Sequence, residues 1–363
     1  MSSKIYVQWK TFFLAIRNRI CYCFLSMSSL FDEPPLTGES LQQAVLSPKA
    51  KRLPIVPGLL YERSCTMFYA DPGIGKSTLV AQIMAQLSTG MPLFGALELA
   101  RPYTCYYIQF ERDAGEILER LAEMEKVIRV DYSKIIVDDR LVGINLLDPN
   151  HAAQLIKRVQ QYSKECGWNQ VDIVPLDPIY ASVRGGLSTD EKATMFTRAS
   201  ALLQKNVGCS NLLLHHATKA SYASETGDKI DKDDSFYGSV WLKAHVTGSF
   251  HIQRNEENGT TWTRKKDNYS CLMKKFNLKY DPASYLSYLD SKHGLTEKRD
   301  RVRLFINSCF KQNRKFVISE VCSAVDSTDR YVRELLAEPE FKAVIEPFPV
   351  PNSPTLFMPK QIL

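Results

Sequence analysis

The sequence predicts an α/β fold with a mostly parallel sheet, followed by a small second domain. From Leu59 onward, short apolar runs alternate with longer helical patterns, which is typical of strands joined by crossover helices. A glycine-rich turn separates the first of these strands from the first helix. Residues 296–363 show a different pattern of short helices and strands and therefore form a separate unit.

The elements of the main domain follow from apolar runs and from helical periodicity. Strands are expected at residues 65–70, 103–110, 134–137, 171–176 and 211–215, with helices at 76–88, 114–127, 152–166 and 191–206. Later strands at 246–253, 260–264 and 272–280 predict a hairpin at the edge of the sheet. Because helices cover both faces of such a sheet, a ligand is expected at the carboxyl ends of the strands.

Composition limits the class of protein. The chain has 363 residues, 44% of them hydrophobic, and a net charge of +6, which permits a polyanionic partner without requiring one. The nine cysteines show no zinc-binding spacing, and Cys65 and Cys105 lie in apolar runs, so we expect free thiols in a reducing cytoplasm. No apolar stretch is long enough to span a bilayer, so no membrane association is expected.

The two ends of the chain differ from the centre. Residues 1–56 are predicted to be a poorly ordered extension and linker, within which residues 1–26 precede a natural polar start at Met27. The main domain then covers residues 57–292. In residues 296–363 we expect helices at 299–311, 319–325, with Ser319 as its cap, and 329–337, then apolar segments at 341–348 and 355–359. This is a winged-helix pattern, which suits binding of duplex DNA, and a structural or subunit-contact module is the alternative.

A phosphate-binding loop is predicted between the first strand and the first helix. Backbone N–H groups of a glycine-rich turn and the positive end of the following helix together hold phosphate oxygens. Lys76 is expected to contact the β and γ phosphates, and the Ser77 hydroxyl suits Mg²⁺. Ala70 stands where the motif normally has its first glycine. The predicted nucleotide-binding residues are Asp71, Pro72, Gly73, Ile74, Gly75, Lys76, Ser77 and Thr78.

Acidic and histidine side chains at other strand ends complete the predicted site. Asp177 ends an apolar strand and is the expected carboxylate for Mg²⁺, with a turn residue before Pro178 as the alternative and Asp172 as a weaker candidate. Glu111 follows another strand and is the expected general base, unless the charges there only cap the next helix. Adjacent strand residues face opposite sides, so one of His215 and His216 faces the nucleotide. There it acts as a sensor of the γ phosphate or is simply a hydrogen-bonded group at a strand end.

Taken together, these motifs resemble the RecA-like ATPases, and among them the plasmid RepA-type hexameric replicative helicases and related ATPases of phages and mobile elements. The resemblance covers roughly residues 57–280. It is carried by Asp71-Pro-Gly-Ile-Gly-Lys-Ser-Thr78, Gln109-Phe-Glu111, Leu176-Asp-Pro178, Gly208-Cys-Ser-Asn-Leu-Leu-Leu-His-His-Ala-Thr-Lys219, Tyr237-Gly-Ser239 and Lys266-Asp-Asn-Tyr269.

The resemblance implies a role for each matching residue. Lys76 and Ser77 bind ATP and magnesium, Glu111 activates water, Asp177 holds magnesium through water, and His216 senses the γ phosphate. The segment after Lys219 faces single-stranded DNA in the channel of a hexameric ring, and Lys266 approaches the ATP of a neighbouring subunit.

Two features depart from the family pattern. The segment 244–248 lacks the arginine that acts in trans, which leaves Arg254, Arg264 and Lys266 as candidates. The expected channel segment also has more acidic than basic residues around Asp228–Asp234, and acidic residues repel DNA phosphates.

The sequence therefore supports three hypotheses. The first is an ATP-hydrolysing DNA motor, a replicative helicase of a plasmid, phage or other mobile element. The second is an ATP-gated DNA-binding regulator or loader with weak hydrolysis, which the missing arginine favours. The third is a recombinase-like filament protein.

Overall fold

The computed structural model describes residues 37–47, 52–187, 189–217, 240–255, 258–269, 273–290, 298–325, 327–348 and 354–360. The chain divides into two units, residues 1–52 and 53–363, and each is described by itself. Residues 1–26, the expected DNA-facing segment 219–236 and the Tyr237–Ser239 motif lie outside the described residues. In the described part of the chain, no helix is long and apolar enough to cross a membrane.

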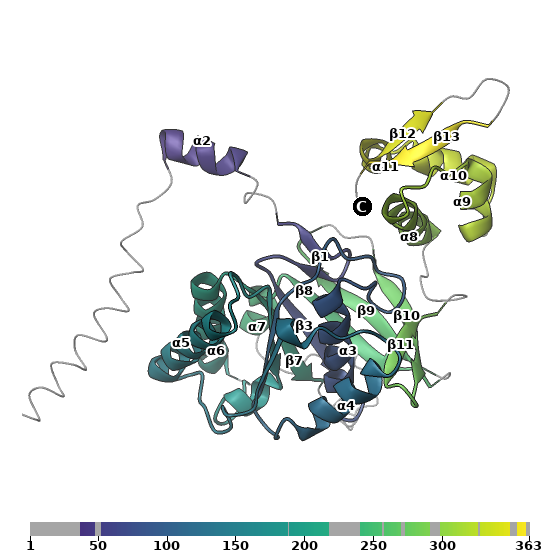
Figure 1. Ribbon diagram of the computed structural model, residues 1–363. Helices are drawn as coiled ribbons and strands as arrows, with labels where there is room; N and C mark the ends of the chain where they lie inside the picture. The colour runs from purple at the N-terminus through teal and green to yellow at the C-terminus, as the bar shows by residue number, and fades with distance from the viewer. Residues whose placement is uncertain are drawn as a thin grey trace, which may run out of the picture. The chain divides into compact units, whose positions relative to one another are not determined.

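One large sheet organises the main domain (Figure 1). Its strands are β3 (Cys65–Ala70), β4 (Cys105–Gln109), β5 (Ile135–Asp138), β6 (Ile173–Asp177), β7 (Ser210–His216), β8 (Gly248–Arg254), β9 (Thr260–Asp267), β10 (Lys275–Asp281) and β11 (Leu286–Leu289). Their order across the sheet is β11-β10-β9-β8-β3-β7-β6-β4-β5. The strands from β8 to β5 in this order are parallel, and β9, β10 and β11 add an antiparallel edge, which confirms the predicted fold class.

Helices cover both faces of the sheet (Figure 1). They are α3 (Lys76–Thr89) and α4 (Gly115–Glu125) on one face, and α5 (Pro149–Glu165), α6 (Asp190–Val207) and α7 (Val240–His245) on the other. Short 3₁₀ turns cover Tyr132–Lys134 and Ile179–Ser182. Successive strand residues alternate between the two cores: in β3, Phe68 and Ala70 pack toward α3, whereas Met67 and Tyr69 pack toward the opposite helices. Every residue of β3 is buried, as expected for a central strand covered on both sides.

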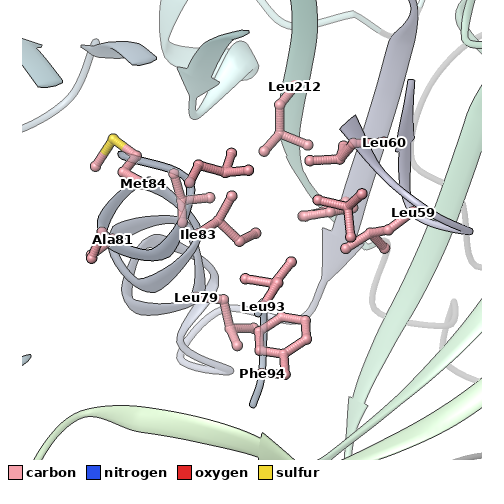
Figure 2. Packing of buried hydrophobic residues seen from close by; sticks show 14 of the residues in the cluster. Leu59, Leu60, Leu79, Ala81, Ile83, Met84, Leu93, Phe94 and Leu212 are labelled. Carbon is pink, nitrogen blue, oxygen red and sulfur yellow. The ribbon is translucent and has the colours of Figure 1, made fainter. Parts of the chain in front are cut away.

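The first core holds the phosphate-loop helix against the sheet. Figure 2 shows Leu79 and Ile83 of α3 in this cluster with Leu93, Phe94 and Leu212. All of these side chains are at most 4% exposed, so the position of α3 is determined by close packing along its length. This packing places the first turn of α3 at the carboxyl end of β3.

Several boundaries differ from the sequence predictions. The region expected to be only a linker contains helix α2 (Gly38–Leu46), which buries no residue and therefore has little apolar periodicity, and strand β1 (Pro54–Val56). β1 pairs with β2 (Leu60–Tyr61), which was not predicted, and neither were α7 and β11. β9 extends to Asp267, three residues beyond its predicted end at Arg264. Cys65 and Cys105 are buried free thiols as predicted, and burial raises the pKa of Cys65 to about 12.

The C-terminal residues have their own small core. It contains α8 (Lys298–Lys311), α9 (Ile318–Val325), α10 (Asp329–Leu336) and α11 (Pro339–Val344), followed by the paired strands β12 (Ile345–Phe348) and β13 (Leu356–Pro359). The predicted order of helix, helix-turn-helix and β pair is present, but the first part of segment 341–348 is helical. Ser319 is not the cap of α9, because the helix starts one residue earlier and Glu320 Oε2 accepts the Val317 N–H at 2.8 Å. The assignment as a winged-helix unit that binds DNA stays a prediction.

We expect the aromatic cluster around Trp262 to dominate the stability of the antiparallel edge. Trp262 is fully buried and its ring contacts Phe68, Phe250 and Phe276 at centroid distances of 4.7, 6.0 and 5.3 Å. Trp262→Ala should lower the free energy of unfolding by about 3–5 kcal/mol, measured by chemical denaturation. Leu118→Ala, at a side chain that is 53% exposed, is the control and should change it by less than about 1 kcal/mol.

Candidate nucleotide-binding site

The loop between β3 and α3 has the backbone shape of a phosphate cradle. Gly73 has φ 80° and Gly75 has φ 93°, values in the left-handed region that other residues adopt only with strain. Gly75 is also the residue that precedes the first turn of α3, so the free N–H groups of the helix begin there. Ile74 packs against the core and anchors the loop from below. The loop therefore presents backbone donors at a helix N-terminus, which suits phosphate.

Ala70 explains its own departure from the motif. It is the last residue of β3 and does not have a positive φ, so this position does not need a glycine. Its carbonyl oxygen accepts hydrogen bonds from Lys76 Nζ at 3.0 Å and from the Ala217 N–H at 2.9 Å. Ala70 thus ties the phosphate loop to the end of β7 through its backbone alone.

Lys76 lies at the centre of the loop with its ammonium group almost buried. Besides Ala70, Nζ donates to the Asp71 carbonyl at 3.1 Å and lies 3.5 Å from His216 Nδ1. Burial lowers the pKa of Lys76, and the charges of Asp177 and Asp71 raise it in part. The ammonium is therefore held close to the loop by carbonyl groups, in a position from which it can contact a phosphate oxygen.

Asp177 ends β6 and is 3% exposed. The Tyr107 hydroxyl donates to Asp177 Oδ2 at 2.7 Å, and Ser77 hydrogen-bonds the same carboxylate. Burial raises the pKa of Asp177, while these hydrogen bonds and the Lys76 charge oppose the rise. The two expected magnesium-binding residues, Ser77 and Asp177, therefore contact each other, as their predicted roles require.

Glu111 follows β4, one strand away from Asp177. Its backbone N–H donates to Gln109 Oε1 at 3.3 Å, and Gln109 is the register partner of Asp177 in the neighbouring strand. The Glu111 carboxylate hydrogen-bonds the Tyr180 hydroxyl, and burial together with this contact raises the pKa of Tyr180 to about 12. The carboxylate itself is exposed to the space above the strand ends.

The two histidines at the end of β7 occupy different environments. His215 is fully buried, on the side of Tyr69, whereas His216 is partly exposed beside Lys76. The His216 ring also contacts the Tyr180 ring at a centroid distance of 4.8 Å. Burial and the Lys76 charge lower the pKa of His216, so this imidazole is neutral at pH 7. His216 is therefore the histidine whose ring meets the loop lysine.

One cavity of about 810 Å³ brings these groups together. It is lined by the loop and by residues from the ends of β4, β6 and β7, including Lys76, Ser77, Glu111, Asp177 and His216. Thr78, Pro72, Gly73 and Gly75 also line it, whereas Asp71 and Ile74 do not. A volume of this size accommodates a nucleotide.

Sequence reasoning missed two cations in the cavity. Arg112 and Arg120 both line it, and Glu116 of α4 pairs with Arg112 at 2.6 Å and with Arg120 at 2.9 Å. The charge of Arg120 also acts on Asp177 and Tyr107. In the sequence these arginines look like ordinary i, i+4 ion pairs of a surface helix, so no local signal identifies them.

Other candidates lie outside the cavity. Asp172 is held at the opposite end of β6 by Arg101 at 2.7 Å, so it is not part of this site. Arg264 is buried and pairs with Asp267 at 3.2 Å, which makes it a structural residue. Lys266 Nζ donates to the carbonyl groups of Lys243 and Ala244 at 2.7 and 2.9 Å. Arg254 contacts the phosphate loop of its own chain, at the Gly73 carbonyl, 3.1 Å away.

The donor set fits magnesium bound together with phosphates. Mg²⁺ prefers oxygen ligands and is usually held by one or two carboxylates plus substrate phosphates and water. Ser77 and Asp177 offer a hydroxyl and one carboxylate next to the phosphate cradle. Within the described residues, no group of three or more histidine, cysteine or acidic side chains could hold a metal ion. This donor set favours a metal ion that arrives with a nucleotide.

Comparison with known proteins agrees with this geometry. The family model for the AAA domain matches residues 33–222, just over half of the 363-residue chain. Among solved structures, an ATPase domain superposes with a TM-score of 0.50 at 11% identity, over 69% of this chain and 95% of that chain. A KaiC-like protein from Pyrococcus horikoshii OT3 has a TM-score of 0.42 at 16% identity, over 66% of this chain and 98% of that chain. No curated protein matches the sequence.

The match to the AAA domain model includes the phosphate loop, Glu111, Asp177 and His216. The mostly parallel sheet with its antiparallel edge and the likeness to the first of these solved structures confirm the predicted fold. The chain therefore belongs to the AAA domain family of P-loop ATPases, with a RecA-like core.

Proposed function

We propose that this protein is a magnesium-dependent ATPase that works as a DNA motor, a replicative helicase of a plasmid, phage or other mobile element. The observation that carries the proposal is the single cavity that combines the phosphate loop, the Asp177 carboxylate, the Glu111 carboxylate and the His216 ring. These are the parts that phosphoryl transfer to water requires: a cradle for phosphates, a metal-binding carboxylate and a base for water.

In this proposal each residue acts at one position along the triphosphate. The loop amides and Lys76 hold the β and γ phosphates, and Ser77 and Asp177 hold Mg²⁺, which neutralises developing charge on the phosphate oxygens when it is bound. Glu111 accepts a proton from the attacking water. Arg112 and Arg120 add positive charge within the same chain, which supports hydrolysis although segment 244–248 has no arginine.

His216 links the site to the segment that follows β7. Its neutral ring lies between Lys76 and Tyr180, so contact with a γ phosphate would change the hydrogen bonds at the end of the strand. The proposed motor transmits this change along residues 217–239 to single-stranded DNA in a hexameric ring, in which Lys266 approaches the ATP of a neighbouring copy. The net charge of +6 is compatible with DNA as partner.

The second candidate is an ATP-gated DNA-binding regulator or loader. The lack of an arginine in segment 244–248 favours it, because a missing trans-acting arginine costs roughly 10³–10⁵ in turnover. The helix-turn-helix order of α9 and α10 also favours it as a reader of duplex DNA. Strand displacement separates the two: a wild type that binds duplex DNA but never unwinds it, as Lys76→Ala is expected to behave, supports the regulator.

Lys76→Ala is expected to weaken ATP binding by roughly 10- to 150-fold. Charge-assisted hydrogen bonds contribute about 1.5–3 kcal/mol, and the ammonium group has no substitute within the loop. Binding of a fluorescent ATP analogue to the purified protein measures the effect. Lys126→Ala, on the exposed side of α4, is the control and should bind like wild type. Equal affinities for the two variants would exclude this cavity as the nucleotide site.

Glu111→Gln is expected to retain ATP binding and to lose hydrolysis by roughly 10²–10⁴-fold, because glutamine cannot accept the proton of water. Phosphate release measures the rate, and Glu123→Gln is the control because Glu123 lies on α4 outside the cavity lining. Wild-type turnover by Glu111→Gln would assign the base elsewhere.

The motor also predicts that single-stranded DNA accelerates hydrolysis by the wild type. The expected increase is severalfold at low salt and smaller at high salt, since phosphate contacts are screened. ATPase rates with and without single-stranded DNA over several salt concentrations test this. Equal rates throughout would remove the motor and leave the regulator.

A further inference from the structure

We propose that Tyr107 is a positioning residue that orients the Asp177 carboxylate for a metal–nucleotide complex and connects it to the backbone of Glu111. The inference rests on the proposed function, because it assigns to Asp177 the magnesium-binding role given there. Tyr107 lies in the middle of β4 and its side chain is fully buried, so it does not touch the substrate.

A continuous chain of hydrogen bonds runs across the two strand ends. The Tyr107 hydroxyl donates its proton to Asp177 Oδ2 at 2.7 Å and accepts from Gln109 Nε2 at 3.1 Å. Gln109 Oε1 then accepts the Glu111 N–H at 3.3 Å. Because Gln109 and Asp177 are register partners in neighbouring strands, the pairing of β4 with β6 determines this geometry. The chain of bonds joins the proposed metal-binding residue to the proposed base.

The direction of each bond in this chain follows from chemistry. A phenol has a single proton to donate, and Gln109 Nε2 can only donate to its oxygen, so the proton must point to Asp177. Burial and the Asp177 charge raise the pKa of Tyr107 well above its ordinary value, which keeps the proton on the hydroxyl. The bond occupies Oδ2 and leaves Oδ1 as the carboxylate oxygen that is free for water or a metal ion.

Such a donor restricts rotation of the carboxylate. A ligand whose orientation is held by a second hydrogen-bonding group binds its metal more tightly, and loss of that group typically weakens metal binding roughly 10- to 100-fold. Ser77 contacts both Asp177 and Tyr107, so the hydroxyl that is proposed to meet Mg²⁺ belongs to the same cluster. Tyr107 is therefore placed to organise both proposed metal-binding groups at once.

The preceding residue provides a matched control. Tyr106 is equally buried, faces the opposite side of β4, and donates to Asp138 Oδ2 at 2.8 Å. Asp138 pairs with Arg158 at 2.6 Å and neither residue lines the nucleotide cavity. Tyr106→Phe and Tyr107→Phe therefore remove the same atom from equivalent buried tyrosine–aspartate bonds, and only the second bond belongs to the site.

The test measures metal binding without turnover. Mn²⁺ titration followed by electron paramagnetic resonance, in the presence of a non-hydrolysable ATP analogue, reports affinity for the metal–nucleotide complex. Tyr107→Phe should weaken Mn²⁺ binding about tenfold, leave binding of the analogue in EDTA within twofold of wild type, and lower the melting temperature no more than Tyr106→Phe does. Tyr106→Phe should keep wild-type Mn²⁺ affinity. Wild-type Mn²⁺ affinity in Tyr107→Phe, or an equal loss in both variants, would overturn the inference.

Gln109→Met provides a second arm should Tyr107→Phe fold poorly. It removes the donor to the tyrosine oxygen without touching Asp177, and a loss of Mn²⁺ affinity of about threefold is expected. No change in this variant would overturn the connection between Asp177 and Glu111. A wild type that binds the Mn²⁺–analogue complex but does not hydrolyse ATP would remove the proposed motor. The same result would leave the role of Tyr107 supported, so failure of one idea is distinct from failure of the other.

Discussion

The burial of two opposite charges at one edge of the sheet is the constraint on which the rest of the site depends. Lys76 is 8% exposed and Asp177 is 3% exposed. Removal of an ion from water costs several kcal/mol unless hydrogen bonds and opposite charge replace the lost hydration. Burial shifts both pKa values toward the neutral forms, down for Lys76 and up for Asp177, and each charge opposes the shift of the other. The surrounding donors and acceptors are therefore needed to keep the pair ionised.

Strand register supplies those groups. Ala70 and His216 are partners across β3 and β7, and Gln109 and Asp177 are partners across β4 and β6, so the ends of these strands form one line. The Ala70 carbonyl receives the ammonium, and Tyr107 from the neighbouring strand receives the carboxylate. The pairing of central strands that folds the domain also builds the site, and a slip of one residue would point these side chains to the other face.

How far the site could be predicted depended on where a residue lies in its element. Lys76, Glu111, Asp177 and His216 stand at strand ends or at a helix start, positions that alternating apolar runs reveal, and one cavity contains all of them. Tyr107 lies inside a buried strand, where an aromatic residue looks like ordinary core until its partner is known. Arg120 lies within α4 and resembles a surface ion pair. The predicted cap at Ser319 is wrong because a serine before an apolar run resembles a cap, although Glu320 does the capping.

Lys266 shows why the proposed trans contact needs more than this single chain. Its register partner is Ser249, near the start of β8, whereas the phosphate loop follows the far end of β3, where Ala70 pairs with Ile252. Within one chain the ammonium caps the carbonyl groups of Lys243 and Ala244 at the end of α7. An ammonium has three donors, and solvation by these carbonyls competes with a phosphate for them. If Lys266 serves the ATP of a neighbouring copy, it must give up part of this cap. The end of α7, which follows the segment proposed to face DNA, would then respond to nucleotide in the adjacent site.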